Sequence, residues 1–278
     1  MATPYDDLLA LALGVAVEAG ELLLRRPDDL GVDTKSSATD VVTVMDRASE
    51  ELVVGRLLDG RPGDALLAEE GAERSGTSGV RWVVDPLDGT VNYLHRLPFW
   101  AVSIAAESRG EVVAGVVHAP VLGWTFTATR GGGAWQGQEQ LRGSSCTELS
   151  RALVATGFAY DATRRGQQGA VAAAVLPRVA DLRRCGSGAL DLCMAAWGVV
   201  DASYERGLSP WDHAAGGLVA SEAGLLVTGL QGAAAGWAMT VAAPPALAPD
   251  LLKLLTELDA THEGQRAPGP EEQAGSRQ

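Results

Sequence analysis

Hydrophobic and polar positions in the first sixty residues follow the period of helices. Residues 4–26 begin with a proline, carry acidic residues in the first turn and end in two arginines, the charge order that a helix dipole favours. Residues 41–58 show a similar pattern, with Thr43 or Asp40 as the helix cap. We therefore predict two helices joined by a polar loop at residues 34–40.

Short apolar runs bounded by turn residues predict strands in the middle of the chain. The first run covers residues 65–68, and three more follow at residues 100–107, 112–119 and 124–129. Their spacing is typical of an antiparallel meander. The glycine-rich segment at residues 131–137 lacks the strand–G-x-G-x-x-G–helix order of a dinucleotide loop and favours a hairpin.

A linker at residues 144–151 leads into a second half in which strands and helices alternate. We predict strands at residues 153–157, 181–186, 199–205 and 238–242, and helices at residues 167–176, 188–197, 209–223 and 249–258. The last segment, residues 261–278, is rich in Gln, Glu, Gly and Pro, so we expect it to be disordered.

Composition narrows the class of protein. The chain has 278 residues, enough for one large domain or two ordinary ones, and 46% of them are hydrophobic, which indicates a globular core. The formal net charge of −13 argues against direct nucleic-acid binding, which normally needs a basic face. An acidic protein that handles anions needs local positive charge, and metal ions are one source of it.

The cysteine spacing and the N-terminal segment indicate the cellular compartment that we expect for the protein. The three cysteines form no C-x-x-C pair, so a disulfide framework or a zinc site is not indicated. The apolar run at residues 8–17 is flanked by acidic residues and is too short to span a membrane. We therefore expect a soluble protein of the reducing cytoplasm that makes no membrane contact.

One stretch carries the strongest sign of chemistry. An apolar run after Trp82 ends in Asp85 and Pro86, where proline interrupts a strand ladder. Asp88, Gly89 and the next threonine are residues that begin turns and helices. Two carboxylates therefore lie at a strand end, with free backbone N–H groups beyond them. Such a corner can hold hard cations and a phosphate, although an Asp-Pro turn followed by a helix cap would have the same sequence.

Three more acidic residues lie at predicted element ends: Asp46, Glu69 and Asp212. Each alone is typical of a solvated carboxylate or a helix cap. Magnesium, however, needs several oxygen ligands and completes its shell with water and substrate phosphate. A set of that kind could be formed by Glu69, Asp85, Asp88, Asp212 and the backbone carbonyl of Leu87.

Four segments, in order, resemble the landmarks of the inositol monophosphatase family. They are K-S-S-x-x-D-x-V-T-x-x-D at residues 35–46, the acidic pair at residues 69–70, W-V-V-D-P-L-D-G-T-V-N-Y at residues 82–93, and W-D-H-A-A-G at residues 211–216 with S-E-A-G at residues 221–224. Leu225 departs from the pattern, which usually has a further glycine there. That position follows the site and does not alter its chemistry.

The resemblance implies a role for each matched residue. Glu69, Asp85, the Leu87 carbonyl, Asp88 and Asp212 would bind two to three Mg²⁺ ions. The backbone N–H groups of Gly89 and Thr90 would hold phosphate oxygens. The Thr90 hydroxyl and Asp46 would take a proton from a water activated by the metal, so Asp46, Thr90 and Glu69 form the implied catalytic set. Displacement at phosphorus would then need no covalent enzyme intermediate.

Substrate contacts are implied by fewer residues. Glu205 matches a family position that contacts substrate hydroxyls, Asp88 can serve both a metal and a hydroxyl, and the turn before Gly188 can bring N–H groups close. Lys35 would offset the negative charge of the metal cluster, or else would be a solvated loop lysine. The four histidines lack metal-ligand spacing and are expected on the surface or in loops: His95, His118, His213 and His262.

The resemblance also implies a fold and an activity. We expect the layered αβαβα sandwich of the sugar phosphatases, with an α+β half at residues 1–143, an α/β half at residues 144–260 and the metals in the cleft between them. The implied reaction is Mg²⁺-dependent, lithium-sensitive hydrolysis of myo-inositol monophosphate by a homodimer. Histidinol phosphate, fructose 1,6-bisphosphate and adenosine 3',5'-bisphosphate are alternative substrates. A non-catalytic role beside transcription or ribosome-assembly machinery is an alternative of another class.

Overall fold

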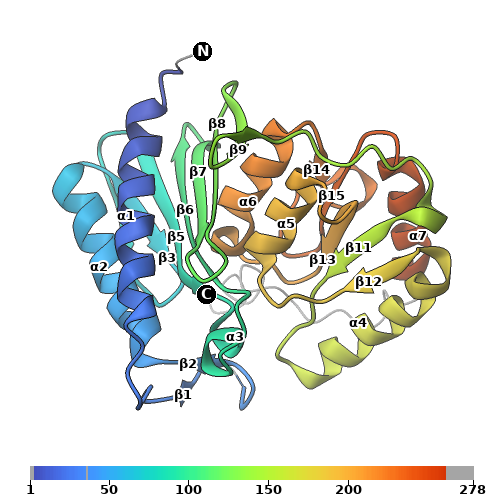
Figure 1. Ribbon diagram of the computed structural model, residues 1–278, viewed down its shortest axis with the longest axis horizontal. Coiled ribbons are helices and arrows are strands. Elements are labelled where there is room, and N and C mark those ends of the chain that lie inside the picture. The colour runs from blue at the N-terminus through green and yellow to red at the C-terminus, as the bar shows by residue number, and fades with distance from the viewer. Residues whose placement is uncertain (1–2, 36, 261–278) are drawn as a thin grey trace, which may run out of the picture.

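Helices and sheets alternate in five layers in the computed structural model, which describes residues 3–35 and 37–260 (Figure 1). Helices α1 and α2 cover the outer face of a large sheet, α5 and α6 lie between the two sheets, and α4 and α7 cover the far face of the smaller sheet. This arrangement confirms the expected α/β fold with its αβαβα order. The helices are α1 (Asp6–Leu24), α2 (Val44–Gly60), α3 (Thr90–Leu94), α4 (Ala162–Val175), α5 (Gly188–Trp197), α6 (Pro210–Glu222) and α7 (Ala248–Ala260).

The larger sheet has eight strands in the order β10-β9-β8-β7-β6-β5-β3-β4. They are β3 (Ala65–Ala68), β4 (Glu73–Arg74), β5 (Val80–Asp88), β6 (Ala101–Ser108), β7 (Glu111–Ala119), β8 (Trp124–Thr129), β9 (Gly133–Gln136) and β10 (Glu139–Gln140). Neighbouring strands are antiparallel except β3 and β5, which run parallel. The predicted meander and glycine-rich hairpin are confirmed, and β4 is a further short strand at the edge of the sheet.

The smaller sheet has five strands in the order β12-β11-β13-β15-β14. They are β11 (Leu153–Thr156), β12 (Asp181–Arg183), β13 (Ala202–Glu205), β14 (Leu226–Thr228) and β15 (Thr240–Ala243). β11 runs parallel to both of its neighbours, while β15 is antiparallel to β13 and β14. The remaining short elements are β1 (Asp33–Thr34), β2 (Val41–Val42) and the 3-10 turns at Leu149–Arg151, Leu176–Arg178 and Leu230–Gly232.

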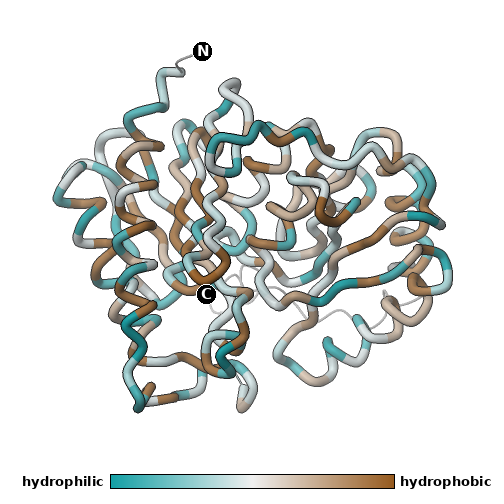
Figure 2. The backbone as a smooth tube through the Cα atoms, in the orientation of Figure 1, coloured by the Kyte–Doolittle hydropathy of each residue, from teal (hydrophilic) through white to brown (hydrophobic). Residues whose placement is uncertain are grey.

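Residues 82–84 of β5 are apolar without alternation because both faces of the larger sheet are covered. Trp82 and Val84 pack in the core that the sheet shares with α1 and α2. Val83, on the opposite face, packs in the core shared with α5 and α6. Figure 2 shows the hydrophobic stretches concentrated in the strands and in the helix faces turned towards them. The acidic residues Asp85 and Asp88 therefore extend from a strand that is buried from Trp82 onwards.

Two helix starts differ from the prediction. Helix α2 begins at Val44, because Val41–Val42 pair with Asp33–Thr34 as a small hairpin and Thr43 caps the helix. Helix α4 begins earlier than predicted, at Ala162, where the Asp161 side chain accepts a hydrogen bond from the first turn. In both places a tertiary or capping partner sets the boundary.

The expectation for the histidines holds for His95, which is exposed, and is wrong for His118 and His213. His118 lies in β7, half-buried, and its Nδ1 is 2.9 Å from the Thr125 hydroxyl. Burial lowers its pKa. His213 lies in the first turn of α6. His262 and the predicted tail at residues 261–278 lie outside the described residues.

The boundary predicted between residues 143 and 144 falls in the segment that connects the two sheets. One apolar core, however, includes both Val117 of the larger sheet and Ala155 of the smaller one. Division into two domains stays a prediction. Across residues 3–35 and 37–260 the structure contains no helix with the length and apolarity that crossing a bilayer requires.

Candidate active site

Parallel pairing of β3 with β5 brings the first two predicted acidic residues together. Ala68 pairs with Val84, so the next residue of each strand, Glu69 and Asp85, lie side by side. The register of β5 against β6 shifts after Asp85, at the position of Pro86. The N–H of Leu87 instead donates to Asp85 Oδ1 at 3.0 Å. The prediction that the strand ladder stops at Asp85 and Pro86 is therefore wrong, because the register shifts there and the strand continues to Asp88.

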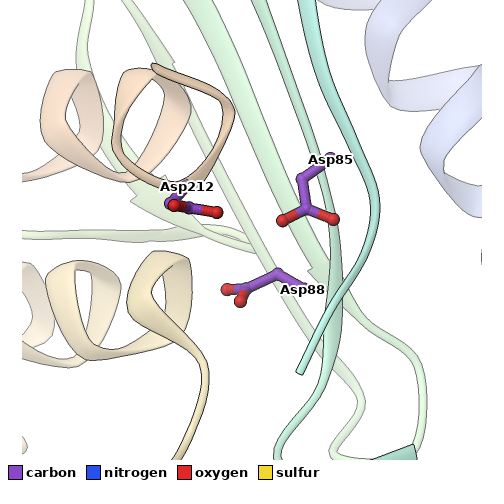
Figure 3. A group of neighbouring side chains, drawn as sticks. All are labelled: Asp85, Asp88 and Asp212. Atoms are coloured by element: carbon purple, nitrogen blue, oxygen red, sulfur yellow. The ribbon is translucent and has the colours of Figure 1, made fainter. Parts of the chain in front are cut away.

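Asp85, Asp88 and Asp212 form one group of carboxylates. Each contributes an oxygen, and these oxygens lie within 4.8 Å of one another. Figure 3 shows the three side chains directed into a common space between β5 and the start of α6. Asp212 belongs to a capping box, in which its Oδ2 accepts the N–H of Ser209 at 2.6 Å. Asp212 is therefore a helix cap, as the alternative interpretation of the sequence held, and the same capping contact orients its carboxylate towards the group.

Asp88 is held from the opposite side of the site. Its Oδ2 accepts hydrogen bonds from the Ser187 hydroxyl at 2.5 Å and from the Ala189 N–H at 2.8 Å. Both donors belong to the start of α5, where Ser187 is the helix cap. These two protein donors fix the orientation of the Asp88 carboxylate.

Electrostatics of this group favour a bound cation. Burial, together with the charges of Glu69 and Asp88, raises the pKa of Asp85 well above its ordinary value. Burial and the same charges raise the pKa of Asp212. Burial raises the pKa of Asp88 to about 6, against the lowering effect of its hydrogen bonds from Ser187 and Ala189. Crowded carboxylate oxygens of this kind are suitable ligands for a hard divalent cation, which would relieve the repulsion.

Glu69 and Lys35 are linked at the edge of the group. Lys35 Nζ lies 2.9 Å from Glu69 Oε1 and 2.5 Å from Glu70 Oε1. Burial alone would lower the pKa of Lys35, but the two glutamates raise it. Lys35 is therefore an ion-paired residue, and its interpretation as a solvated loop lysine is wrong. Glu69 lies beside the three aspartates but outside the compact oxygen group.

A buried pair lies next to the carboxylates. The Thr90 hydroxyl donates to Asp46 Oδ1 at 2.7 Å, and it also lies 3.2 Å from the carbonyl oxygen of Leu87. The other Asp46 oxygen accepts the N–H and hydroxyl of Thr43 at 2.8 and 2.6 Å. Both Asp46 and Thr43 are inaccessible to solvent. The start of α2 thus fixes Asp46, and Asp46 fixes the Thr90 hydroxyl.

Two further residues of α2, which the sequence analysis did not single out, hold the segments around the Asp46–Thr90 pair in place. The Ser49 hydroxyl donates to the carbonyl of Pro86 at 2.8 Å, which ties α2 to the bend in β5. The Glu50 carboxylate accepts the N–H groups of Glu70 and Ala72 at 2.8 and 3.2 Å, which holds the turn after β3. Ser49 and Glu50 lie three and four positions after Asp46, on the same helix face, but no local pattern marks that face as buried.

Gly89 makes the turn between β5 and α3. Its φ is +95°, and a Cβ there would lie 2.8 Å from the carbonyl oxygen of Phe99, so only glycine fits. The first N–H groups of α3 follow this turn. Because α3 has five residues, any phosphate binding here would rest on those N–H groups more than on a helix dipole.

The predicted substrate contacts come from the smaller sheet and α5. Gly188 is the first residue of α5, and Glu205 is the last of β13. Burial and the charge of Asp88 raise the pKa of Glu205 to about 8, with Arg184 opposing them. Gly157 leaves space for this side chain, because a Cβ there would lie 2.0 Å from Glu205 Oε1. Asp191 of α5 is a further buried acid that the sequence pattern did not reveal.

Solved structures with the same fold indicate the class of protein to which the chain belongs. The fold is that of phosphatases. It matches the extragenic suppressor protein SuhB of Bartonella henselae with a TM-score of 0.85, at 36% identity over 90% of this chain and 98% of that one. It also matches an IMPase of Thermotoga maritima with a TM-score of 0.84, at 31% identity over 92% of this chain and 99% of that one.

The family follows from the sequence. The model of the inositol monophosphatase family matches residues 5–261, and the chain belongs to that family. It is 43% identical to the inositol-1-monophosphatase of Mycobacterium leprae over 92% of this chain and 96% of the relative. It is 40% identical to the Nus factor SuhB of Escherichia coli over 81% of this chain and 86% of the relative. Family membership makes the chain an inositol-phosphate phosphatase, a phosphoric monoester hydrolase.

Proposed function

We propose that the protein hydrolyses myo-inositol monophosphate to inositol and phosphate, with two to three Mg²⁺ ions at the carboxylate group. The observation that carries this proposal is the convergence of Asp85, Asp88 and Asp212 within 4.8 Å. Glu69 and the Leu87 carbonyl complete the proposed ligand set. When bound, magnesium ions make water a stronger acid and stabilise negative charge on the leaving oxygen.

The chain's own residues supply the proton transfer. The Thr90 hydroxyl donates a hydrogen bond to Asp46, so its oxygen lone pairs are available to accept a proton from the attacking water. As the hydroxyl accepts that proton, it can pass its own to the Asp46 carboxylate. This relay needs the fixed orientation that Thr43 gives Asp46. Glu69 completes the catalytic set by orienting the water from the other side.

Binding is assigned to backbone donors and to carboxylates. The N–H groups of Gly89 and Thr90 would hold phosphate oxygens. Asp88, Glu205 and the N–H of Gly188 would contact hydroxyls of the polyol, because carboxylates and backbone donors suit neighbouring hydroxyl groups. Lys35 would offset part of the negative charge through its contacts with the acidic pair at residues 69–70.

A substrate panel tests the identity of the alcohol. Phosphate release from myo-inositol 1-phosphate is expected to need Mg²⁺, to be inhibited by lithium and to be lost in Asp85→Asn. Its kcat/KM should exceed the values for histidinol phosphate, fructose 1,6-bisphosphate and adenosine 3',5'-bisphosphate. A higher value for histidinol phosphate would overturn the substrate and leave the mechanism in place. Activity that persists in a chelator would overturn the mechanism.

A second candidate function is supported by the relative named Nus factor SuhB. We propose, as the alternative, a non-catalytic role beside transcription machinery in the cytoplasm, through protein contacts and not through direct contact with nucleic acid. Recovery of RNA polymerase or ribosomal factors with an inactive Asp88→Asn variant would support it. We also propose a homodimer, which sedimentation velocity would test directly.

A further inference from the structure

A small cavity lies between α5 and the smaller sheet, next to Glu205. Asp191 and Gly188 of α5 line one side of it, and Ser203 and Glu205 of β13 line the other. Because side chains alternate along a strand, Ser203 and Glu205 face the same side of the sheet. The cavity therefore joins two proposed substrate contacts, Gly188 and Glu205, to a buried acid and a buried hydroxyl behind them.

Polar atoms in this cavity wall lack protein partners. Asp191 is 3% exposed, and neither of its carboxyl oxygens has a hydrogen bond within the described structure. The Ser203 hydroxyl is likewise buried without a partner. The thiol of Cys185 influences the pKa of Asp191, but a thiol is a weak donor and makes no hydrogen bond of normal geometry there. Buried polar groups destabilise the folded state if they remain without a hydrogen-bond partner.

The cavity has room for about one water molecule. The centre of a water molecule can move within about 10 Å³ of it, close to the minimum of about 10–15 Å³ that one water needs. Water also satisfies both kinds of group, since it can donate to carboxyl oxygens and exchange hydrogen bonds with a hydroxyl. A hydrated divalent ion would require several more ligands than this space provides.

We propose that one internal water molecule bridges the Asp191 carboxyl and the Ser203 hydroxyl to the Glu205 carboxyl. Asp191 is then a positioning residue that acts on the substrate through Glu205. The open space at Gly157 accommodates the Glu205 carboxyl on one side, and the water restrains it on the other. This inference rests on the proposed function, because it uses Glu205 as the contact for a substrate hydroxyl.

A high-resolution crystal structure tests the water without reference to activity. One density peak is expected about 2.7–3.2 Å from an Asp191 oxygen, the Ser203 hydroxyl and a Glu205 oxygen. In Asp191→Leu, which has the same number of side-chain heavy atoms without polar groups, the peak should disappear. An empty cavity in the wild type, or a peak at the shorter distances of metal ligands, would overturn the proposal.

Kinetics test the positioning role. Asp191→Leu should raise KM for myo-inositol 1-phosphate about tenfold and leave kcat within about twofold, because it removes one water-mediated support of a binding group. Asp191→Asn retains donors and acceptors for the water and should restore KM to within about threefold of the wild type. The melting temperature of Asp191→Leu should stay at or above the wild-type value, which shows that the fold is intact.

A double-mutant cycle separates positioning from a merely structural role. If Asp191 acts through Glu205, Asp191→Leu should not raise KM further in a Glu205→Ala background. An undiminished tenfold effect in that background would overturn the positioning role, as would an unchanged KM in Asp191→Leu alone. Failure of the proposed function has a different result, because the wild type itself would then release no phosphate. The crystal structure would still show whether the water molecule is present.

Discussion

The Thr90 hydroxyl donates a 2.7 Å hydrogen bond to the Asp46 carboxylate across 44 positions of sequence. The remaining oxygen of Asp46 is occupied by Thr43, the cap of α2. The same carboxylate thus completes a helix cap and holds the hydroxyl next to the proposed metal ligands. Its stability role and its proposed catalytic role use different oxygens, so substitutions can separate them.

Thr90→Ala should lower kcat at least about 100-fold, because it removes the hydroxyl proposed to accept a proton from water. Thr90→Ser is the matched control and should stay within about tenfold of the wild type, since it retains the hydroxyl. The measurement is steady-state kcat at saturating Mg²⁺ and substrate. Equal activity of the Ala and Ser variants would exclude Thr90 from the proton transfer.

Magnesium should raise the melting temperature of the wild type but not that of Asp85→Asn, because a ligand that binds only the folded state stabilises it. Without metal, Asp85→Asn should melt about 2–4 °C above the wild type, because a neutral amide relieves roughly 1 kcal/mol of carboxylate repulsion. Differential scanning calorimetry with and without a chelator measures both effects.

The exposed residue Asp59 provides the control for that experiment, since Asp59→Asn should behave as the wild type does. A magnesium shift of wild-type size in Asp85→Asn would remove Asp85 from the ligand set.

Neighbouring glutamates offer a further matched pair. Both Glu69 and Glu70 contact Lys35, but only Glu69 lies beside Asp85. Glu69→Gln should lower kcat/KM at least about 100-fold, whereas Glu70→Gln should cost less than about tenfold. The comparison uses kcat/KM as a function of Mg²⁺ concentration. Similar losses in both variants would indicate that the ion pair, and not a ligand role, explains the importance of Glu69.

Metal-free protein should lose stability as pH rises from about 4 to about 8. Burial raises the pKa of Asp88 from 3.8 to about 6 and that of Glu205 from 4.5 to about 8. Between the unfolded and folded pKa values, the folded state binds more protons than the unfolded state, so the free energy of unfolding falls with increasing pH. The stabilisation that comes from protonation of these two carboxyl groups is fully present below their pKa in the unfolded state. It is lost as pH rises through their pKa in the folded state.

Urea unfolding in a chelator measures this dependence. Glu205→Gln should flatten the decline between about pH 6 and pH 8, because the titration of Glu205 extends above that of Asp88. A steeper decline in Glu205→Gln than in the wild type would contradict the assignment.

Sequence alone locates the parts of the site that have local signals. Asp85 and Asp88 flank a proline that follows an apolar strand, and Asp212 lies in a capping box, so each carries a short-range pattern. Their convergence depends on partners distant in sequence, which no local pattern specifies. The identification of the set therefore relied on resemblance to a family, and the structure shows where those residues lie.

Residues without local signals were not found. Ser49, Glu50 and Asp191 lie inside helices, where a polar residue on a buried face looks like any other polar position. The start of α2 was misplaced for a related reason, because Val41 pairs with Thr34 instead of continuing the helix. Pairing across a loop overrides helix propensity, and it cannot be read from the segment itself.

The hydrogen bond between Ser187 and Asp88 joins residues 99 positions apart. Asp212 lies still further along the chain. A nascent chain that has not yet reached α6 therefore has the Gly89 turn and two of the three aspartates, but no closed carboxylate group. The proposed magnesium site should then form only after α6 has been synthesised, so that a shorter chain lacks one of its carboxylates.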